Sequence, residues 1–216
     1  MTDRAAVLQL LLELRQAGVC DNRVLAAIEA VPREYFVPEI FQARAWENTA
    51  LPIGQHQTIS QPQVVALMTQ ALDIGERMKI LEVGTGSGYQ AAILARLCRR
   101  VYSIERHAPL LAEAEARFRA LRIHNITAKI ADGMKGWREQ APFDRIMITA
   151  AAPTIPDSLV GQMIAGGIMV LPVGDQFSEQ EILRLRRTHS GYKSESLSAV
   201  RFVPLLPGVA TSAAPG

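Results

Sequence analysis

KILEVGTGSGY, residues 79–89, is the stretch that decides the fold. An apolar segment typical of a strand runs into three closely spaced glycines, and a helix-like segment, QAAILA at 90–95, follows directly. Glycines let a backbone approach a ligand closely because they carry no Cβ atom, and the start of a helix offers unpaired N–H groups. The stretch therefore predicts a strand, a ligand-binding turn and a helix; a tight turn without a ligand is the alternative.

A second predicted strand, 100–104, ends at Glu105. In dinucleotide-type folds an acidic side chain at this place accepts hydrogen bonds from the ribose hydroxyls of a nucleoside. Glu105 also follows the glycines at the distance that one strand–helix–strand unit requires. We expect Glu105 to bind ribose, and the chain to be an enzyme that uses a nucleoside cofactor.

The spacing of the glycines indicates which nucleoside cofactor to expect. The dinucleotide fingerprint Gly-x-Gly-x-x-Gly would have its third glycine at position 89, where Tyr89 stands. Gly84, Gly86 and Gly88 form Gly-x-Gly-x-Gly instead, and Glu82 precedes them. This pattern resembles the first motif of S-adenosylmethionine-dependent methyltransferases, so a methyltransferase is favoured over a dehydrogenase.

The composition leaves room for one α/β domain with a short extra segment, because the 216 residues are 49% hydrophobic and 20% charged. A net charge of +2 is too small to argue for nucleic acid or an anionic membrane surface as a partner. Cys20 and Cys98 provide neither a disulfide framework nor a zinc-site spacing, which fits a reducing compartment. The uncharged run 158–174 contains Gly166, Gly167 and Pro172, which argues against a membrane span. We expect a cytoplasmic protein.

The chain divides into three parts. Residues 1–78 form a helical leader, with helices at 5–16 and 22–30, that packs onto the main domain. Residues 79–206 alternate short apolar runs with helical patterns, which predicts a doubly wound, mostly parallel sheet. Its strands are expected at 80–83, 101–104, 127–130, 145–149 and 168–173, its helices at 89–97, 109–121 and 156–164, and an antiparallel pair at 182–187 and 197–203. Residues 207–216, small residues and proline, form a tail predicted to be disordered.

Two further places can carry polar ligand contacts. Asp132 and Gly133 follow the strand 127–130 at the carboxyl edge of the sheet, where Asp132 can accept a hydrogen bond from an adenine amino group or can cap a turn. Ser60 and Gln63 match the Ser-x-x-Gln capping box of the amphipathic helix that follows. Helix capping can account for Ser60, although a cap hydroxyl can also face a ligand at the helix N-terminus, and capping leaves the polar segment 54–58 unexplained.

Several motifs together resemble the protein-L-isoaspartate O-methyltransferases. They are VPRE at 31–34, LPIG at 51–54, QTISQP at 57–62, EVGTGSGYQ at 82–90, APFD at 141–144 and FVPL at 202–205. The resemblance runs from about residue 10 to about residue 206. TISQP, at 58–62, is the specific motif, because other methyltransferases share the glycine loop without it. His56 is a departure, since the family usually has glycine at that position.

The resemblance implies a class I methyltransferase fold with a seven-stranded sheet, S-adenosylmethionine as cofactor and no metal. The cofactor residues that it implies are Glu82, Gly84, Thr85, Gly86, Ser87, Gly88, Glu105, Arg106, Asp132 and Gly133. The acceptor residues that it implies are Thr58, Ile59, Ser60 and Leu205, with Ser60 as the catalytic residue. The implied partners are isoaspartyl-containing proteins and peptides, and the protein is expected to be a monomer. A methyltransferase for another acceptor and a non-catalytic S-adenosylmethionine-binding protein are the alternatives.

Overall fold

The computed structural model describes residues 3–175 and 179–211. The deciding stretch folds as predicted: strand β3 (Lys79–Val83) enters the glycine loop, and helix α4 (Tyr89–Leu97) begins directly after Gly88. Gly88 has the left-handed φ of 92°, which lets the chain turn from the loop into the helix.

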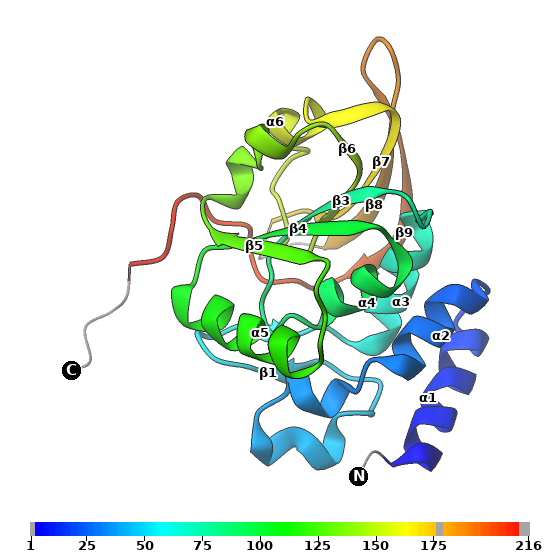
Figure 1. Cartoon of the computed structure of the whole chain (residues 1–216). Coiled ribbons are helices and arrows are strands. Elements are labelled where there is room, and N and C mark those ends of the chain that lie inside the picture. Colours follow the sequence, from blue (N-terminus) through cyan, green and yellow to red (C-terminus); the bar gives the residue numbers. More distant parts are fainter. Residues whose placement is uncertain (1–2, 176–178, 212–216) are drawn as a thin grey trace.

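A seven-stranded sheet forms the centre of the described chain (Figure 1). Its strands are β3, β4 (Arg100–Glu105), β5 (Ile126–Ile130), β6 (Phe143–Ile148), β7 (Met163–Val173), β8 (Gln180–Arg187) and β9 (Tyr192–Val200). They lie in the order β5-β4-β3-β6-β7-β8-β9. The first five are parallel, whereas β8 and β9 are antiparallel to their neighbours. The expected fold class is confirmed.

Helices cover both faces of the sheet because its central strands are apolar on both sides. Ile80 and Met147 belong to one hydrophobic cluster, whereas Leu81 and Ile146 belong to a second cluster on the opposite face. The first face carries α1 (Arg4–Gln16), α2 (Asn22–Ala30), α3 (Pro62–Ala71), α4 and α5 (Ala108–Ala120). The second carries α6 (Asp157–Val160) and the 3₁₀ turns η3 (Gly133–Lys135) and η4 (Arg138–Gln140).

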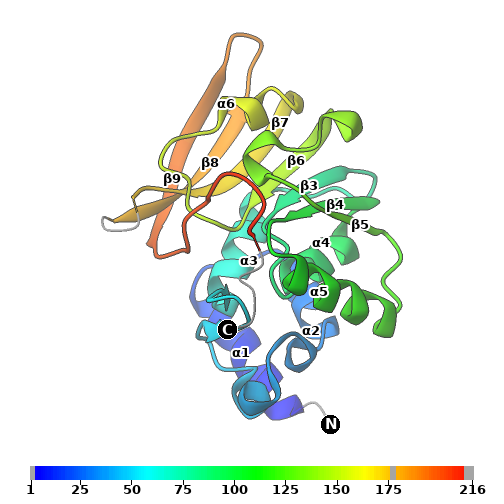
Figure 2. The ribbon, with the colours of Figure 1, turned by 90° about the vertical axis from the view of Figure 1, so that its left-hand side faces the viewer.

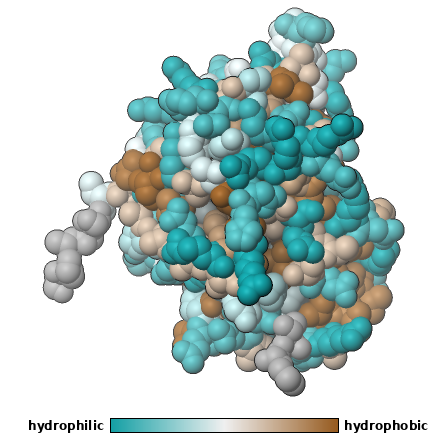
Figure 3. Space-filling model, viewed as in Figure 1, coloured by the Kyte–Doolittle hydropathy of each residue, from teal (hydrophilic) through white to brown (hydrophobic). Residues whose placement is uncertain are grey.

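The leader packs into the same core as the sheet. Leu14 of α1 and Ile28 of α2 belong to the cluster that contains Ile80 of β3. Between α2 and α3 the chain forms the 3₁₀ helices η1 (Arg33–Phe36) and η2 (Glu39–Arg44) and a small hairpin of β1 (Leu51–Pro52) and β2 (Thr58–Ile59). The outer side of α1 exposes two leucines, Leu8 and Leu12, and hydrophobic atoms gather on this side of the molecule in Figure 3.

The bounds of α6, β7 and β9 differ most from the predicted ones. The helix expected at 156–164 is only α6, because Met163 already pairs with Phe143 as the first residue of β7. The strand expected at 197–203 is β9, which begins at Tyr192 and ends at Val200. β9 lies at the edge of the sheet and is exposed along most of its length, so its first half lacks the apolar alternation that sequence patterns detect.

The segment after β9 turns back across the carboxyl edge of the sheet (Figure 2). The Ala151 N–H donates to Val203 O at 2.8 Å, and the Leu205 N–H donates to Ala151 O at 2.7 Å. Residues 207–211, predicted to be disordered, contact Arg106: its guanidinium donates to Pro207 O and Gly208 O, and its carbonyl accepts from the Ala210 N–H. The rest of the predicted tail, 212–216, lies outside the described residues.

Candidate active site

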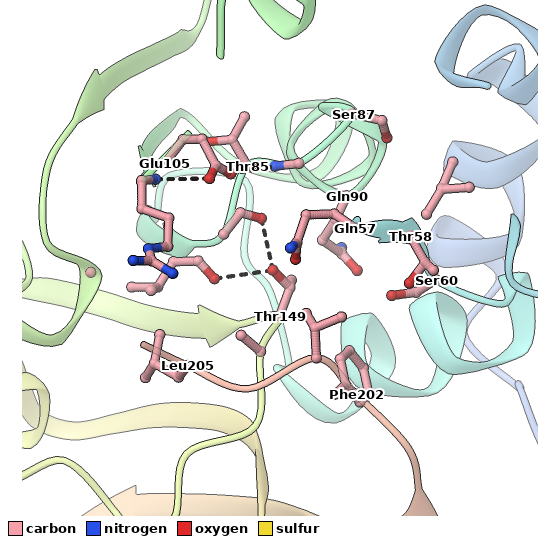
Figure 4. Close-up of a pocket in the computed structure, with 18 of the residues that line it drawn as sticks. Gln57, Thr58, Ser60, Thr85, Ser87, Gln90, Glu105, Thr149, Phe202 and Leu205 are labelled. Atoms are coloured by element: carbon pink, nitrogen blue, oxygen red, sulfur yellow. Dashed lines mark hydrogen bonds between the residues drawn. The ribbon is translucent and has the colours of Figure 1, made fainter. Parts of the chain in front are cut away.

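A cleft opens at the carboxyl edge of the parallel strands, where doubly wound sheets bind ligands (Figure 4). One side, which we call the glycine wall, consists of residues 83–87 and 104–107 in the loops after β3 and β4. The opposite side, which we call the serine wall, consists of residues 57–60 before α3. The segment 202–206 lines a third side. The cleft therefore combines loops of the sheet with parts of the leader and of the C-terminal segment.

Gly84 and Gly88 of the loop are required by the protein's own packing, whereas Gly86 is not. A Cβ atom on Gly84 would lie 2.3 Å from Thr149 Oγ1, and one on Gly88 would lie 2.7 Å from the ring of Phe118. At Gly86, whose φ is 53°, the added Cβ would meet only Ile53 at 3.7 Å. Gly84 and Gly86 line the cleft, whereas Gly88 does not. Gly88 thus serves the turn into α4, and Gly84 lets the end of β6 approach the loop.

Glu105 stands at one end of the cleft as a carboxylate held by backbone donors. Its Oε2 accepts from the Gly86 N–H at 2.8 Å, and its Oε1 accepts from the N–H groups of Arg106 and His107 at 2.8 and 2.9 Å. A carboxylate oxygen offers about two acceptor sites. Oε2 therefore keeps one for a ligand hydroxyl, as a ribose-binding role requires.

Glu82 lies beneath the glycine wall and does not line the cleft, although it was expected among the cofactor residues. Strand alternation places it on the same face as Ile80, inside the layer covered by helices. Its Oε2 accepts from Ser103 Oγ, which in turn lies 2.6 Å from Thr85 Oγ1. Burial raises the pKa of Glu82 to about 8; the hydrogen bond from Ser103 opposes this rise and the charge of Glu105 adds to it. Glu82 therefore supports Thr85 from behind, through Ser103.

The other expected cofactor residues divide between the cleft and the turns beside it. Thr85, Ser87, Arg106 and Gly133 line the cleft. Asp132 does not, and its Oδ1 accepts from the Met134 N–H at 3.0 Å, so its capping role is present in the structure.

The serine wall is built on a strained hairpin turn. β1 and β2 pair Leu51 with Ile59, and the Gln57 N–H donates to Gly54 O at 3.1 Å. The two central turn residues, Gln55 and His56, have φ values of 59° and 55°. A turn with two positive φ values is of the type I′ class, which prefers glycine at its second central position. His56 occupies that position, so the departure from the family pattern lies where the backbone favours glycine.

Ser60 is not the cap of α3, and the predicted capping box is wrong. The N-cap position is Gln61, and the cap hydrogen bond comes from Asn48, whose Oδ1 accepts from the Gln63 N–H at 3.1 Å. Asn48 Nδ2 also donates to Gln63 Oε1 at 3.1 Å. Among the residues described, the Ser60 hydroxyl has no hydrogen-bond partner, and Ser60 lines the cleft. Its hydroxyl is thus available to a ligand.

The acceptor residues expected from the sequence meet in the cleft. Thr58, Ile59, Ser60 and Leu205 all line it. In Figure 4, Glu105 lies at one end, Thr58 and Ser60 at the other, and Thr149 between them. A nucleoside cofactor can lie along the glycine wall with its ribose at Glu105 and its other end toward Ser60.

Thr149, Gln90 and Phe202 are among the lining residues that sequence reasoning missed. Thr149 Oγ1 lies 2.7 Å from Gly84 O and 3.0 Å from Val83 O, joining β6 to the loop. Its place at the end of a predicted strand was the available signal. Gln90, whose Nε2 donates to Thr69 Oγ1 at 3.0 Å, lies in the first turn of α4. Phe202 reaches the cleft only because the C-terminal segment turns back, which no local pattern indicates.

The described residues, 3–175 and 179–211, contain no group of three or more His, Cys, Asp or Glu side chains that could hold a metal ion. They also contain no helix with the length and apolar character needed to cross a membrane.

Comparisons with known proteins agree with one another. The family described as protein-L-isoaspartate(D-aspartate) O-methyltransferase matches residues 5–210. A protein-L-isoaspartate O-methyltransferase of Paramagnetospirillum magneticum is 64% identical over 204 residues, covering 94% of this chain and 95% of the relative. One of Rhodospirillum centenum is 58% identical over 214 residues, covering 99% and 97%. A solved protein-L-isoaspartate O-methyltransferase has a TM-score of 0.84 at 25% identity, covering 92% of this chain and 65% of that one. A putative protein-L-isoaspartate O-methyltransferase of Plasmodium falciparum, solved with S-adenosyl-L-homocysteine, has a TM-score of 0.79 at 23% identity, covering 92% and 97%.

Proposed function

Because the chain belongs to the protein-L-isoaspartate(D-aspartate) O-methyltransferase family, we propose that it methylates the α-carboxylate of L-isoaspartyl residues in damaged proteins and peptides, using S-adenosylmethionine. The observation that carries this assignment is the Ser60 hydroxyl, which has no partner among the described residues and lines the same cleft as the glycine loop. The resulting ester cyclises spontaneously to a succinimide, which reopens in part to normal aspartate.

The glycine wall fits S-adenosylmethionine. Glu105 keeps an acceptor site for a ribose hydroxyl, Gly86 leaves open space beside the backbone, and Thr85, Ser87, Arg106 and Gly133 complete the lining. When bound, the cofactor supplies an electrophilic methyl group on a sulfonium. Glu82 and Asp132 act from behind the cleft, Glu82 through Ser103 and Thr85 and Asp132 by capping its turn.

Methylation of a carboxylate requires no general base. An α-carboxyl group has a reference pKa near 3.5, so the acceptor is already ionised at neutral pH. The acceptor oxygen forms a bond to the methyl carbon while the carbon–sulfur bond breaks and its electron pair goes to sulfur, so no proton moves. The protein contributes by aligning and desolvating the carboxylate, which can supply up to about 7 to 11 kcal/mol. Ser60 donates a hydrogen bond that orients the carboxylate, beside Thr58, Ile59 and Leu205.

The parts of the chain divide the work. Residues 1–78 supply the serine wall and recognise the acceptor, residues 79–206 bind the cofactor, and the tail takes no part in the chemistry. The protein works as a cytoplasmic monomer on isoaspartyl-containing proteins and peptides, without nucleic acid or membrane partners. The low net charge of +2 and the absence of a disulfide framework support this.

Transfer of a tritiated methyl group to an isoaspartyl peptide, with its normal aspartyl twin as control, tests the proposal. We expect base-labile label in the isoaspartyl peptide alone. Equal labelling of both peptides would contradict the acceptor, and cofactor binding without transfer to either would contradict the enzymatic role.

A further inference from the structure

Arg33 is a fully buried cation without an ion-pair partner in the part of the chain that the structure describes. Its exposed fraction is 0%, and no carboxylate lies within ion-pair distance of it. Burying a charge costs several kcal/mol unless a partner compensates it. Arg145, near the amino end of β6, is also buried, but its guanidinium lies 3.6 Å from the carboxylate of Asp73. The environment of Arg33 therefore calls for an explanation that Arg145 does not require.

The guanidinium of Arg33 holds three backbone carbonyls. Its Nε donates to Ala45 O at 2.8 Å, and its Nη2 donates to Ser60 O at 2.8 Å and lies 3.4 Å from Thr49 O. Because the fork of an arginine is planar and rigid, these bonds fix the relative positions of the carbonyls. The Ser60 backbone is thereby tied to η1, 27 residues earlier in the chain.

The same guanidinium packs on the ring of Tyr89, which lies next to the glycine loop. Its central carbon lies 4.7 Å from the centre of the Tyr89 ring. Tyr89 follows Gly88 directly and lines the cleft. Arg33 therefore contacts both Ser60, whose hydroxyl faces the acceptor, and Tyr89, which follows the glycine loop.

The packing of Arg33 against Tyr89 leaves two buried polar atoms without hydrogen bonds in the described part of the chain, which costs free energy. Arg33 Nη1 and the Tyr89 hydroxyl are both buried without a hydrogen-bond partner among the residues described. Burial lowers the pKa of Arg33 and raises that of Tyr89, and the interaction between the two side chains opposes both shifts. Unsatisfied buried groups in a native structure require an explanation, and helix packing alone would be served equally well by an apolar side chain.

We propose that Arg33 is a positioning residue that sets the place of Ser60 relative to the glycine loop, by holding Ser60 O while resting on the ring of Tyr89. This inference rests on the proposed function, in which the acceptor carboxylate must lie in line with the transferred methyl group. A misplacement of about 1 Å can lower a reaction rate about 100-fold. Neither the affinity for the cofactor nor that for the acceptor peptide needs to change by a comparable factor.

Arg33→Lys tests the proposal, with Arg145→Lys as the matched control. Lysine keeps an amine donor on a flexible side chain and loses the planar fork in both variants. We expect kcat per folded molecule to fall about 10- to 100-fold in Arg33→Lys, with the Kd for S-adenosylhomocysteine within about twofold of wild type. Arg145→Lys should lower the unfolding midpoint and leave kcat unchanged. Equal kcat losses in both variants, or an unchanged kcat in Arg33→Lys, would overturn the proposal.

A thiol probe measures the position of residue 60 without any acceptor. In a Cys20→Ser, Ser60→Cys background, adding Arg33→Lys should change the iodoacetamide reaction rate of the new thiol at least threefold, whereas adding Arg145→Lys should not. If the wild type fails to methylate isoaspartyl peptide and the thiol still responds to Arg33→Lys, the acceptor assignment fails and the positioning role stands. An unresponsive thiol overturns the positioning role.

Should Arg33→Lys not fold, the wild-type protein decides the question. In a ¹⁵N-arginine-labelled sample, an isoaspartyl peptide added with S-adenosylhomocysteine should shift the Arg33 Nε–H resonance and leave that of Arg145 in place. An unmoved Arg33 resonance at saturating peptide overturns the proposal.

Discussion

The two walls of the cleft are held in opposite ways. The glycine wall has its partners inside one regular strand–helix–strand unit: the Gly84 N–H donates to Ile104 O, and the Gly86 N–H donates to Glu105. The serine wall depends on Arg33 and Asn48, which precede it by 27 residues for Ser60 and 15 for Gln63. One wall is a product of a single strand–helix–strand unit, and the other is a product of the leader. Substitutions in the glycine wall should therefore change stability and cofactor affinity together, whereas those around the serine wall should change transfer without a loss of cofactor affinity.

The largest effect is expected from the buried acid under the glycine wall. The pKa of Glu82 is raised from 4.5 to about 8, so the folded protein binds a proton that the unfolded chain releases above pH 4.5. The stability of wild type relative to Glu82→Gln should fall between about pH 4.5 and 8 by up to about 1.4 kcal/mol per pH unit, and level off above that range. Urea unfolding at pH 5, 6, 7 and 8 measures this difference, with the exposed Glu76→Gln as control. A constant offset across the range would contradict the role of burial.

Gly84→Ala should break the glycine wall itself. The added Cβ would meet Thr149 Oγ1 at 2.3 Å, and the φ of 99° is unfavourable for alanine. We expect a loss of about 3 kcal/mol in unfolding free energy and at least tenfold weaker binding of S-adenosylhomocysteine, measured by urea unfolding and calorimetry. Gly166→Ala is the control, because its φ is 76° but no atom lies within 4 Å of the added Cβ. It should lose about 1 kcal/mol and keep its affinity; equal affinity losses in both variants would show that general destabilisation, and not the clash with Thr149, weakens binding.

Ser60→Ala should sharpen the comparison by separating transfer from cofactor binding. A hydrogen bond to a charged group is worth about 1.5 to 3 kcal/mol, so kcat/KM for an isoaspartyl peptide should fall about 10- to 100-fold. Affinity for S-adenosylhomocysteine should stay within about twofold. Ser194→Ala, on the exposed edge strand β9, should change neither quantity. A parallel loss of cofactor affinity in Ser60→Ala would mean that the two walls do not act separately.

Asn48→Ala removes the distant cap of α3. Loss of a cap costs about 1 kcal/mol, and the variant also loses the bond from Asn48 Nδ2 to Gln63 Oε1, so the start of α3 after Ser60 is held less firmly. We expect kcat to fall several-fold with little change in cofactor affinity. Asp21→Ala removes the local cap of α2, which accepts from the Arg23 N–H at 2.8 Å, and should cost similar stability without loss of kcat. Should Asp21→Ala lower kcat equally, the effect would belong to general destabilisation.

The smallest effect concerns the turn of the serine wall. His56→Gly relieves a left-handed φ of 55° but adds flexibility to the unfolded chain, for a net stabilisation of about 0.5 kcal/mol. Arg122→Gly, at a φ of 53°, should gain a similar amount. Chemical unfolding midpoints measure both, and only His56→Gly should alter KM for the acceptor peptide. Destabilisation by His56→Gly would show that the histidine side chain itself holds the turn.

Much of the glycine wall could be predicted from the sequence because its determinants are local. The residues at 79–89 specify a strand, a turn and a helix, and the predicted helix 89–97 is α4 without any shift. Glu82 marks the limit of such reasoning. Its motif resembles that of cofactor-binding proteins, but whether its side chain enters the cleft depends on strand alternation and on the helices that cover that face.

The serine wall could be located from the sequence, but its support could not. The Ser-x-x-Gln pattern predicted a local cap, whereas the cap comes from Asn48 in a segment with no regular pattern. A side chain that caps a helix from 15 residues away leaves no periodic signal. The same holds for Phe202, which reaches the cleft through the returning C-terminal segment.

The outer strand β9 bears on how such an enzyme meets its substrates. An extended polypeptide, such as a damaged substrate, can pair as an additional strand with an exposed edge strand through main-chain hydrogen bonds. β9 pairs with β8 alone in the described sheet, and its outer residues include Lys193, Ser194, Glu195 and Ser196, all exposed. Charged and polar side chains on an edge strand disfavour the addition of another strand. Substrate polypeptides are therefore not expected to pair with β9, and they bind instead at the cleft at the carboxyl edge of the parallel strands.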